Sequence, residues 1–122
     1  ILDEYVVSNF PFKNVIILGD LNDDLTEPLN DNVFWTFISK TEEYLFVDMN
    51  IAAGTASNWS FPTWPSHLDH ILITNELFDE FENFGSSIQT IKIEDYLDGG
   101  WNEYETYISD HRPVGLRLVF DP

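Results

Sequence analysis

The fold is decided by the stretch Val15-Ile16-Ile17-Leu18-Gly19-Asp20-Leu21-Asn22-Asp23, in which an apolar run meets a carboxylate. Three of its first four residues are β-branched, which favours a buried strand over residues 15–18. The following residues, 19–32, are polar and acidic and predict a loop. If the strand geometry persists, the side chains of Asp20 and Asn22 point the same way just beyond the strand. Loops at strand ends are where α/β proteins place their functional sites.

Two other interpretations of this stretch compete with a site. A Gly-Asp pair can simply end a strand in a turn, and for the stretch alone we favour that interpretation. A calcium loop of the EF-hand type would begin at Asp20, but it needs Gly at its sixth position and Glu at its twelfth. The chain has Leu25 and Asp31 there. We therefore exclude an EF-hand.

Two later runs repeat the pattern of a carboxylate at a strand boundary. They are Ser66-His67-Leu68-Asp69-His70-Ile71 and Ser109-Asp110-His111-Arg112-Pro113-Val114. The first opens a predicted strand over residues 70–74, and the second precedes an alternating strand over residues 114–120. If these strand ends adjoin, Asp69 accepts a hydrogen bond from His111 and fixes the tautomer of its ring. We expect His67 and His70 to be surface or capping residues.

The remaining segments predict a single α/β domain. Apolar side chains at helical spacing predict helices over residues 1–9, 33–38 and 77–81, the second capped by a residue among 30–32. Short apolar runs predict strands over residues 45–49 and 88–93. Residues 50–66 and 95–107 are predicted to be loops rich in aromatic side chains. These side chains serve either as packing anchors or as contacts to a base or a lipid surface.

The composition narrows the classes of function. The 122 residues include 22 acidic and only 5 basic side chains, with a net charge of −17, so no basic patch is available to grip nucleic acid by its phosphates. The absence of cysteine excludes disulfides and thiolate metal ligands. No apolar run is long enough to cross a bilayer, so we expect no membrane span. The chain opens on Ile1 without a signal peptide, and we expect it to begin inside a longer protein or after processing.

Taken in order, the three runs resemble the motifs of the endonuclease/exonuclease/phosphatase family. This family includes DNase I-like nucleases, abasic-site endonucleases, sphingomyelinases and inositol-polyphosphate phosphatases. Gly19-Asp20-Leu21-Asn22 resembles its Gly-Asp-x-Asn motif, and Leu68-Asp69-His70-Ile71 resembles its second carboxylate strand. Ser109-Asp110-His111-Arg112-Pro113 resembles its C-terminal Ser-Asp-His motif. The resemblance covers nearly the whole chain.

The resemblance implies a fold, a cofactor and a set of roles. The fold would be the DNase I-like four-layer α/β sandwich, of which this chain would supply about half as one mixed β-sheet with flanking helices. The activity would be hydrolysis of a phosphate ester with Mg²⁺, or with Mn²⁺ or Ca²⁺. Asp20 would orient or deprotonate the attacking water, Asn22 would hold the phosphate, and His111 would stabilise charge on a phosphoryl oxygen. Asp69 would support His111, and Asp110 would help to bind the metal.

The chain departs from the family in its first residues. The N-terminal half of the family domain supplies an early Asn, a metal-binding Glu and a further catalytic His or Tyr. Residues 1–19 offer only Asp3, Glu4 and Asn9, on or beside a predicted helix. We therefore expect residues 1–122 to form the C-terminal half of such a domain and to be inactive alone. Its sheet should expose an apolar face to the N-terminal half, or to a second copy of the chain.

Two classes of function follow. The first is a metal-dependent phosphoesterase, foremost a nuclease-like phosphodiesterase and otherwise a sphingomyelinase- or inositol-phosphatase-like enzyme. Its substrate would be nucleic acid, a small phosphodiester or a phospholipid. The second is a non-catalytic binding or assembly segment that retains the sequence of the fold without the full site.

Overall fold

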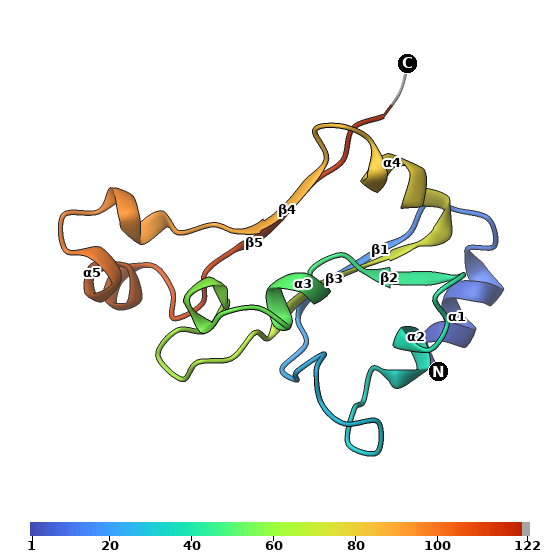
Figure 1. Cartoon of the computed structure of the whole chain (residues 1–122), viewed down its shortest axis with the longest axis horizontal. Helices are drawn as coiled ribbons and strands as arrows, with labels where there is room; N and C mark the ends of the chain where they lie inside the picture. Colours follow the sequence, from blue (N-terminus) through green and yellow to red (C-terminus); the bar gives the residue numbers. More distant parts are fainter. Residues whose placement is uncertain (121–122) are drawn as a thin grey trace.

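The computed structural model describes residues 1–120 and shows two small antiparallel sheets with short helices around them (Figure 1). The larger sheet has the order β1-β3-β2, from β1 (Ile16–Asp20), β3 (Asp69–Thr74) and β2 (Tyr44–Phe46). The smaller sheet pairs β4 (Ser87–Thr90) with β5 (Val114–Arg117). The predicted α/β class is confirmed. The prediction of one mixed sheet is wrong, because every strand pair is antiparallel and the five strands form two separate sheets.

The helices are short and lie between the strands along the chain. The α-helices are α1 (Leu2–Asn9), α2 (Trp35–Ile38), α3 (Met49–Ala52), α4 (Phe78–Glu82) and α5 (Gly100–Tyr107). Three 3₁₀ turns complete the elements: η1 (Ala56–Asn58), η2 (Asn75–Leu77) and η3 (Ile93–Tyr96). In Figure 1, α1 and α2 lie on one side of the larger sheet and α4 on the other, while α5 lies at the far end of the β4–β5 ribbon.

The central strand β3 organises the core, because its residues from His70 to Thr74 are all buried. One face of the sheet carries Leu72, which packs in a cluster with Phe34 and Phe46. The opposite face carries Ile73, which packs in a second cluster with Leu77 and with side chains of β4 and β5. Both faces of β3 are therefore covered, as in a strand from the middle of a layered α/β fold.

Strand β1 differs from the prediction of a fully buried strand. It lies at the edge of the sheet, and its residues alternate between exposed and half-buried. Ile16 and Leu18 are 43% and 66% exposed. With four further apolar side chains they line a groove of about 290 Å³, formed by Ile16, Leu18, Ile71, Val114, Leu116 and Leu118. The sheet thus exposes an apolar face, as predicted.

Several further segments differ from the prediction, among them the strand predicted over residues 114–120, which ends at Arg117. The strand predicted over residues 45–49 ends at Phe46, because the next residues turn into α3. The strand predicted over residues 88–93 ends at Thr90 and is followed by η3. The segment predicted to be a loop over residues 95–107 contains α5, whose Glu103 carboxylate accepts a hydrogen bond from the Gly99 amide at 2.8 Å. This bond satisfies a free donor at the start of the helix.

Candidate functional site

The antiparallel pairing of β1 and β3 places two of the predicted carboxylates opposite each other. Asp20 is the last residue of β1, Asp69 is the first residue of β3, and the two are register partners. Directly opposed residues of an antiparallel pair project their side chains to the same face. We call the predicted residues around this point the strand-end site: Asp20, Asn22, Asp69, Asp110 and His111.

His111 lies against Asp69, as the spacing of the motifs predicts. Its Nδ1 atom is 2.6 Å from Oδ2 of Asp69, and each side chain is 22% exposed. Because Asp69 accepts, Nδ1 carries the proton and the tautomer of the ring is fixed. Nε2 therefore remains for a ligand. The pair is accessible from solvent but held at a single geometry.

The backbone and an aromatic ring hold His111 from the other sides. The amide of His111 donates to the Ser109 hydroxyl at 3.0 Å, and its carbonyl accepts from the buried Tyr104 hydroxyl at 3.0 Å. The ring of Phe61 stacks on the imidazole, with centroids 4.8 Å apart and planes at 23°. Phe61 belongs to the first aromatic segment, so at least this aromatic side chain contacts the site.

Asp20 and Asn22 form a tight turn rather than an extension of the strand. The Asp20 carboxylate accepts a hydrogen bond from the Asn22 amide at 3.0 Å, and Asn22 has a φ of 54°. The strand geometry therefore ends at Asp20, so the condition under which both side chains would point the same way is not met. Both side chains are exposed at the edge of the sheet. Asp110 is exposed as well, and its carboxylate has no hydrogen-bond partner among residues 1–120.

A second cluster of carboxylate and imidazole side chains, separate from the strand-end site, was not predicted. Asp48 Oδ2 is 3.0 Å from His67 Nε2 and 2.7 Å from His70 Nδ1. The three side chains, which we call the Asp48 group, are at most 1% exposed. The prediction that His67 and His70 are surface or capping residues is therefore wrong. Their burial follows from β3, because His70 faces the same core cluster as Leu72 and contacts the rings of Phe34 and Phe46.

The Asp48 group could hold a metal ion, since one ligand atom from each residue lies within 4.8 Å of the others. Its hydrogen bonds instead account for each ring nitrogen. The Ser60 amide donates to His67 Nδ1 at 3.2 Å, so the proton of that ring is on Nε2, which faces Asp48. His70 has an acceptor at both nitrogens, because Nε2 is 2.8 Å from the Asp23 carbonyl. Two N–H groups on one imidazole make it a cation.

The charges of this group stabilise each other. Burial alone would raise the pKa of Asp48, but the hydrogen bonds from His67 and His70 outweigh burial and lower it. Burial alone would lower the pKa of His70, but the bonds to Asp48 and to the Asp23 carbonyl outweigh burial and raise it. The group is therefore a buried ion pair of Asp48 and His70, with His67 as a second hydrogen-bond donor to Asp48.

Residues 1–120 do not supply a complete set of oxygen ligands for the predicted Mg²⁺, Mn²⁺ or Ca²⁺ ion. Mg²⁺, Mn²⁺ and Ca²⁺ prefer oxygen ligands, whereas the Asp48 group offers two nitrogens. Among residues 1–120 it is the one group of three or more ligating side chains within reach of a single ion. The carboxylates of the strand-end site therefore do not by themselves form a complete metal site.

The guanidinium of Arg112 is engaged by acceptors within the protein and has a structural role. Its Nε donates to Glu94 at 2.6 Å, and its Nη1 donates to the carbonyls of Ser57 at 3.0 Å and Trp59 at 3.2 Å. Its guanidinium also lies 5.4 Å from the ring centroid of Trp101. Arg112 thus fastens the segment after His111 to residues 57–60 and to α5.

The aromatic segments contain both packing anchors and exposed rings. Trp59 is an anchor, since its indole donates to the Ile51 carbonyl at 3.0 Å. Tyr104 is fully buried and stacks on Trp101. Trp64 and Tyr96 instead are 78% and 89% exposed. These two rings are available for a contact with a ligand.

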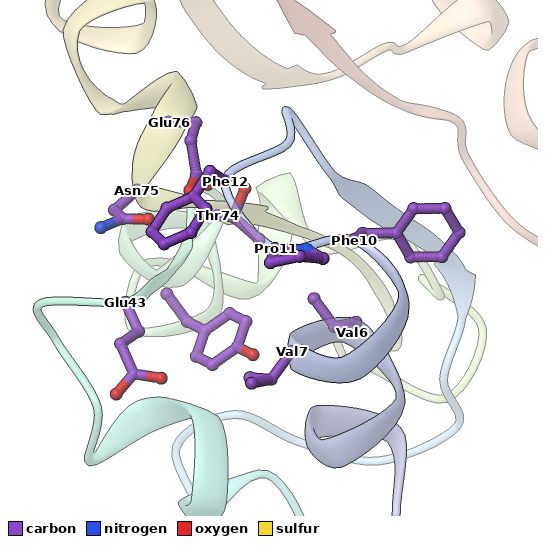
Figure 2. Close-up of a pocket in the computed structure, with 10 residues that line it drawn as sticks. Val6, Val7, Phe10, Pro11, Phe12, Glu43, Thr74, Asn75 and Glu76 are labelled. Atoms are coloured by element: carbon purple, nitrogen blue, oxygen red, sulfur yellow. The ribbon is translucent and has the colours of Figure 1, made fainter.

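A hollow lies at the opposite end of β3 from the strand-end site (Figure 2). Figure 2 shows Val6 and Val7 of α1 on one side and Thr74, the last residue of β3, on another. No residue of the strand-end site lines this hollow, which is lined by Val6, Val7, Phe10, Pro11, Phe12, Glu43, Tyr44, Thr74, Asn75 and Glu76. It therefore has no part in the chemistry of that site.

Comparisons with known proteins give no further assignment. Within residues 1–120, no helix combines the length and the apolar character that a bilayer crossing requires. No protein-family model matches the chain, and neither a curated protein nor a solved structure shows a significant match to it.

Proposed function

We propose that this chain is part of a divalent-metal-dependent phosphoesterase, foremost a nuclease-like phosphodiesterase, and that it supplies the strand-end site. The observation that carries the proposal is the Asp69–His111 pair at 2.6 Å, with Asp20 opposite Asp69 on the neighbouring strand. A fixed imidazole beside exposed carboxylates is an arrangement that phosphoryl transfer uses, because that chemistry depends on positioning and on charge stabilisation.

The Asp69–His111 pair would act on the phosphoryl group. Asp69 holds the Nδ1 proton of His111, so Nε2 is directed to a ligand, and a protonated Nε2 would donate to a phosphoryl oxygen. Phe61, stacked on the ring, excludes water from one face of it. The expected contribution of such a positioned acid is about 10²–10⁴-fold in rate.

Asp20 and Asn22 would act on the water and on the phosphate. The exposed Asp20 carboxylate can accept a proton or a hydrogen bond from the attacking water. The exposed Asn22 amide can donate to a non-bridging phosphate oxygen. A bound divalent metal would supply Lewis-acid stabilisation of the phosphoryl oxygens. We assign Asp110 to it as one ligand, and the others would come from outside residues 1–120.

The apolar groove would receive the rest of the domain. Its six lining side chains come from β1, β3 and the β5 segment, and none of them is charged. Burial of Leu18 and its neighbours against a second sheet would produce the layered sandwich that the family resemblance implies. We therefore propose the N-terminal half of the same domain as the partner at this face.

The charge of the chain favours a small or single-stranded phosphodiester over duplex nucleic acid. Two of the five basic side chains are already used, because Lys40 pairs with Asp3 at 2.7 Å and Arg112 pairs with Glu94 at 2.6 Å. The exposed rings of Trp64 and Tyr96 could stack on a base or contact a lipid head group.

The proposal is tested by hydrolysis of bis(4-nitrophenyl) phosphate with Mg²⁺, using the protein that contains this chain at its full length. We expect His111→Ala and Asp20→Ala each to lower turnover by about 10²–10⁴-fold. Asp98→Asn is the matched control, because it also removes an exposed carboxylate but is not a residue of the strand-end site. Full activity in both site variants would refute the proposal.

A second function is favoured by the incomplete metal site and by the apolar groove. In that case residues 1–122 are a binding or assembly segment with no turnover of their own. Mg²⁺ titrations of the isolated chain and of the complete domain, with the same substrate, separate the two. We expect little or no turnover from the isolated chain under either function, but only the phosphoesterase gains turnover when the rest of the domain is present.

A further inference from the structure

The contacts of the Asp48 group extend beyond its three members to every segment of the strand-end site. The bonds within the group and the bond from the Ser60 amide are buried, since Asp48, His67, His70 and Ser60 are at most 1% exposed, and the bonds that lead on to Asp23 and Asp69 are part-buried. A buried, fully paired polar network holds its members at one geometry more strictly than apolar packing does.

The first arm runs through His70 to the turn that carries Asn22. His70 Nδ1 donates to Asp48 at 2.7 Å, and His70 Nε2 donates to the Asp23 carbonyl at 2.8 Å. Asp23 directly follows Asn22, whose φ of 54° belongs to the left-handed region that a non-glycine residue adopts at a cost. The His70 bond thus holds the turn from its Asp23 side, while the Leu21 amide holds it to the Leu68 carbonyl at 2.9 Å.

The second arm runs through His67 and Ser60 to Asp69 and to the segment after His111. His67 Nε2 donates to Asp48 at 3.0 Å, and the Ser60 amide donates to His67 Nδ1 at 3.2 Å. The Ser60 hydroxyl accepts from the Asp69 amide at 3.2 Å. The Ser60 carbonyl accepts from the Arg112 amide at 2.7 Å. One buried serine therefore ties together the backbones on both sides of the Asp69–His111 pair.

We propose that Asp48 is a positioning residue for the strand-end site: through His70 it sets the Asp20–Asn22 turn, and through His67 and Ser60 it sets Asp69 against His111. A single carboxylate oxygen receives both arms, so a shift of Asp48 moves the two halves of the site together. That Asp48 positions a catalytic site rests on the proposed function, whereas the hydrogen-bond network does not depend on that function.

The two arms can be cut separately while each bond to Asp48 is kept. In His70→Asn, the amide nitrogen replaces Nδ1 and can still donate to Asp48, but nothing reaches the Asp23 carbonyl. In His67→Gln, the amide nitrogen replaces Nε2 and can still donate to Asp48, but nothing accepts from Ser60. Asp48→Asn weakens both arms at once. Thr74→Val is the matched control, because it removes two part-buried hydrogen bonds at the other end of β3, one from the Val15 amide and one to the Lys13 carbonyl.

The readout is the backbone amide chemical shift of Asn22, Asp69 and Arg112 in the isolated chain, measured by ¹H–¹⁵N NMR. We expect His70→Asn to shift Asn22 and leave Arg112 unchanged, and His67→Gln to shift Asp69 and Arg112 and leave Asn22 unchanged. Asp48→Asn should shift all three, and Thr74→Val none of them. If Thr74→Val shifts the same amides as Asp48→Asn, the shifts report a general loss of packing and the proposal is overturned. Unchanged amide shifts in a folded Asp48→Asn variant would also overturn it.

The ring nitrogens of the wild-type chain give a test that needs no variant to fold. From the hydrogen bonds we expect His70 to carry protons on both nitrogens, in slow exchange with water, and His67 to carry one on Nε2, because the Ser60 amide donates to its Nδ1. A bare nitrogen on His70 would break the first arm and overturn the proposal. Neither measurement involves activity, so a failure of Asp20 and His111 variants to change hydrolysis would count against the proposed function alone.

Discussion

The strand-end site and the Asp48 group use the same side chains, carboxylates and imidazoles, in opposite ways. In the strand-end site, Asp20 and Asp110 are exposed, and His111 keeps one ring nitrogen for a ligand. In the Asp48 group, every ring nitrogen and both carboxylate oxygens have a protein partner. Only the first arrangement leaves polar atoms free for a substrate.

The difference shows how burial decides what a carboxylate–histidine pair does. The two pairs have nearly the same separation, 2.6 Å for Asp69–His111 and 2.7 Å for Asp48–His70. One is 22% exposed on each side chain and the other is fully buried. A buried charge must be paired within the protein, whereas a partly exposed one can exchange its partner for a ligand. The geometry of a pair therefore does not identify a catalytic site without its exposure.

The largest expected effect comes from removal of the buried carboxylate. Asp48→Ala leaves the His70 cation and the His67 N–H without an acceptor, and we expect it to lower the free energy of unfolding by about 3–5 kcal/mol. Urea denaturation measures this. Asp98→Ala, at an exposed position, should change it by no more than about 0.5 kcal/mol. An equal loss in the free energy of unfolding for Asp48→Ala and Asp98→Ala would show that the buried carboxylate does not stabilise the fold more than an exposed one.

The pH dependence of stability is the next effect. The pKa of His70 lies above its ordinary 6.5, because the bonds to Asp48 and the Asp23 carbonyl and the nearby Asp24 charge outweigh burial. Its stabilisation is therefore full below pH 6.5 and is lost as the pH rises through the raised pKa. The pKa of Asp48 lies below 3.8, so its stabilisation is full above that value and is lost as the pH falls through the lowered pKa.

These two directions predict a window of highest stability between the ordinary pKa values of the pair. Urea midpoints recorded across pH should fall on the alkaline side in the wild-type chain. The same alkaline fall should be absent from His70→Asn, which has no imidazole at this position. An unchanged pH profile in that variant would show that the buried pair is not the source of the dependence.

The smallest effect concerns the apolar groove, which lies on the face of the sheet opposite the Leu72 core cluster. Leu18 is 66% exposed, so Leu18→Glu should change the free energy of unfolding by no more than about 0.5 kcal/mol. It should nevertheless reduce association of the chain through this face, which sedimentation equilibrium detects. Leu29→Glu, at an exposed loop position, is the control. Equal association of both variants would show that the groove is not a contact surface.

The sequence predicts the strand-end site better than the Asp48 group for a physical reason. Asp69 and His111 stand beside apolar strands whose alternation is visible in the sequence, so their proximity follows once those strand ends meet. Asp48 meets His67 and His70 only because β2 and β3 pair in the register that places Phe46 opposite Leu72. No periodic pattern in a single sequence encodes that register.

The secondary structure shows the same division. Helix α1 and strand β3 follow from apolar spacing alone. Helix α5 was missed because few apolar side chains mark it, and its start depends on the Glu103 bond to Gly99. The exposure of β1 was missed because an apolar, β-branched run is typical of a buried strand, whereas here one face of it is uncovered.

The central claim is that Asp69 acts on the substrate through His111, and a double-mutant cycle of turnover tests it most directly. Turnover of bis(4-nitrophenyl) phosphate is measured for the protein that contains this chain at full length, for Asp69→Asn, for His111→Ala and for the double variant. Residues that act as a unit are strongly non-additive. We predict that Asp69→Asn lowers turnover by about tenfold or more in the wild-type background and by no more than about twofold when His111 is already Ala. Equal factors in the two backgrounds would contradict the claim.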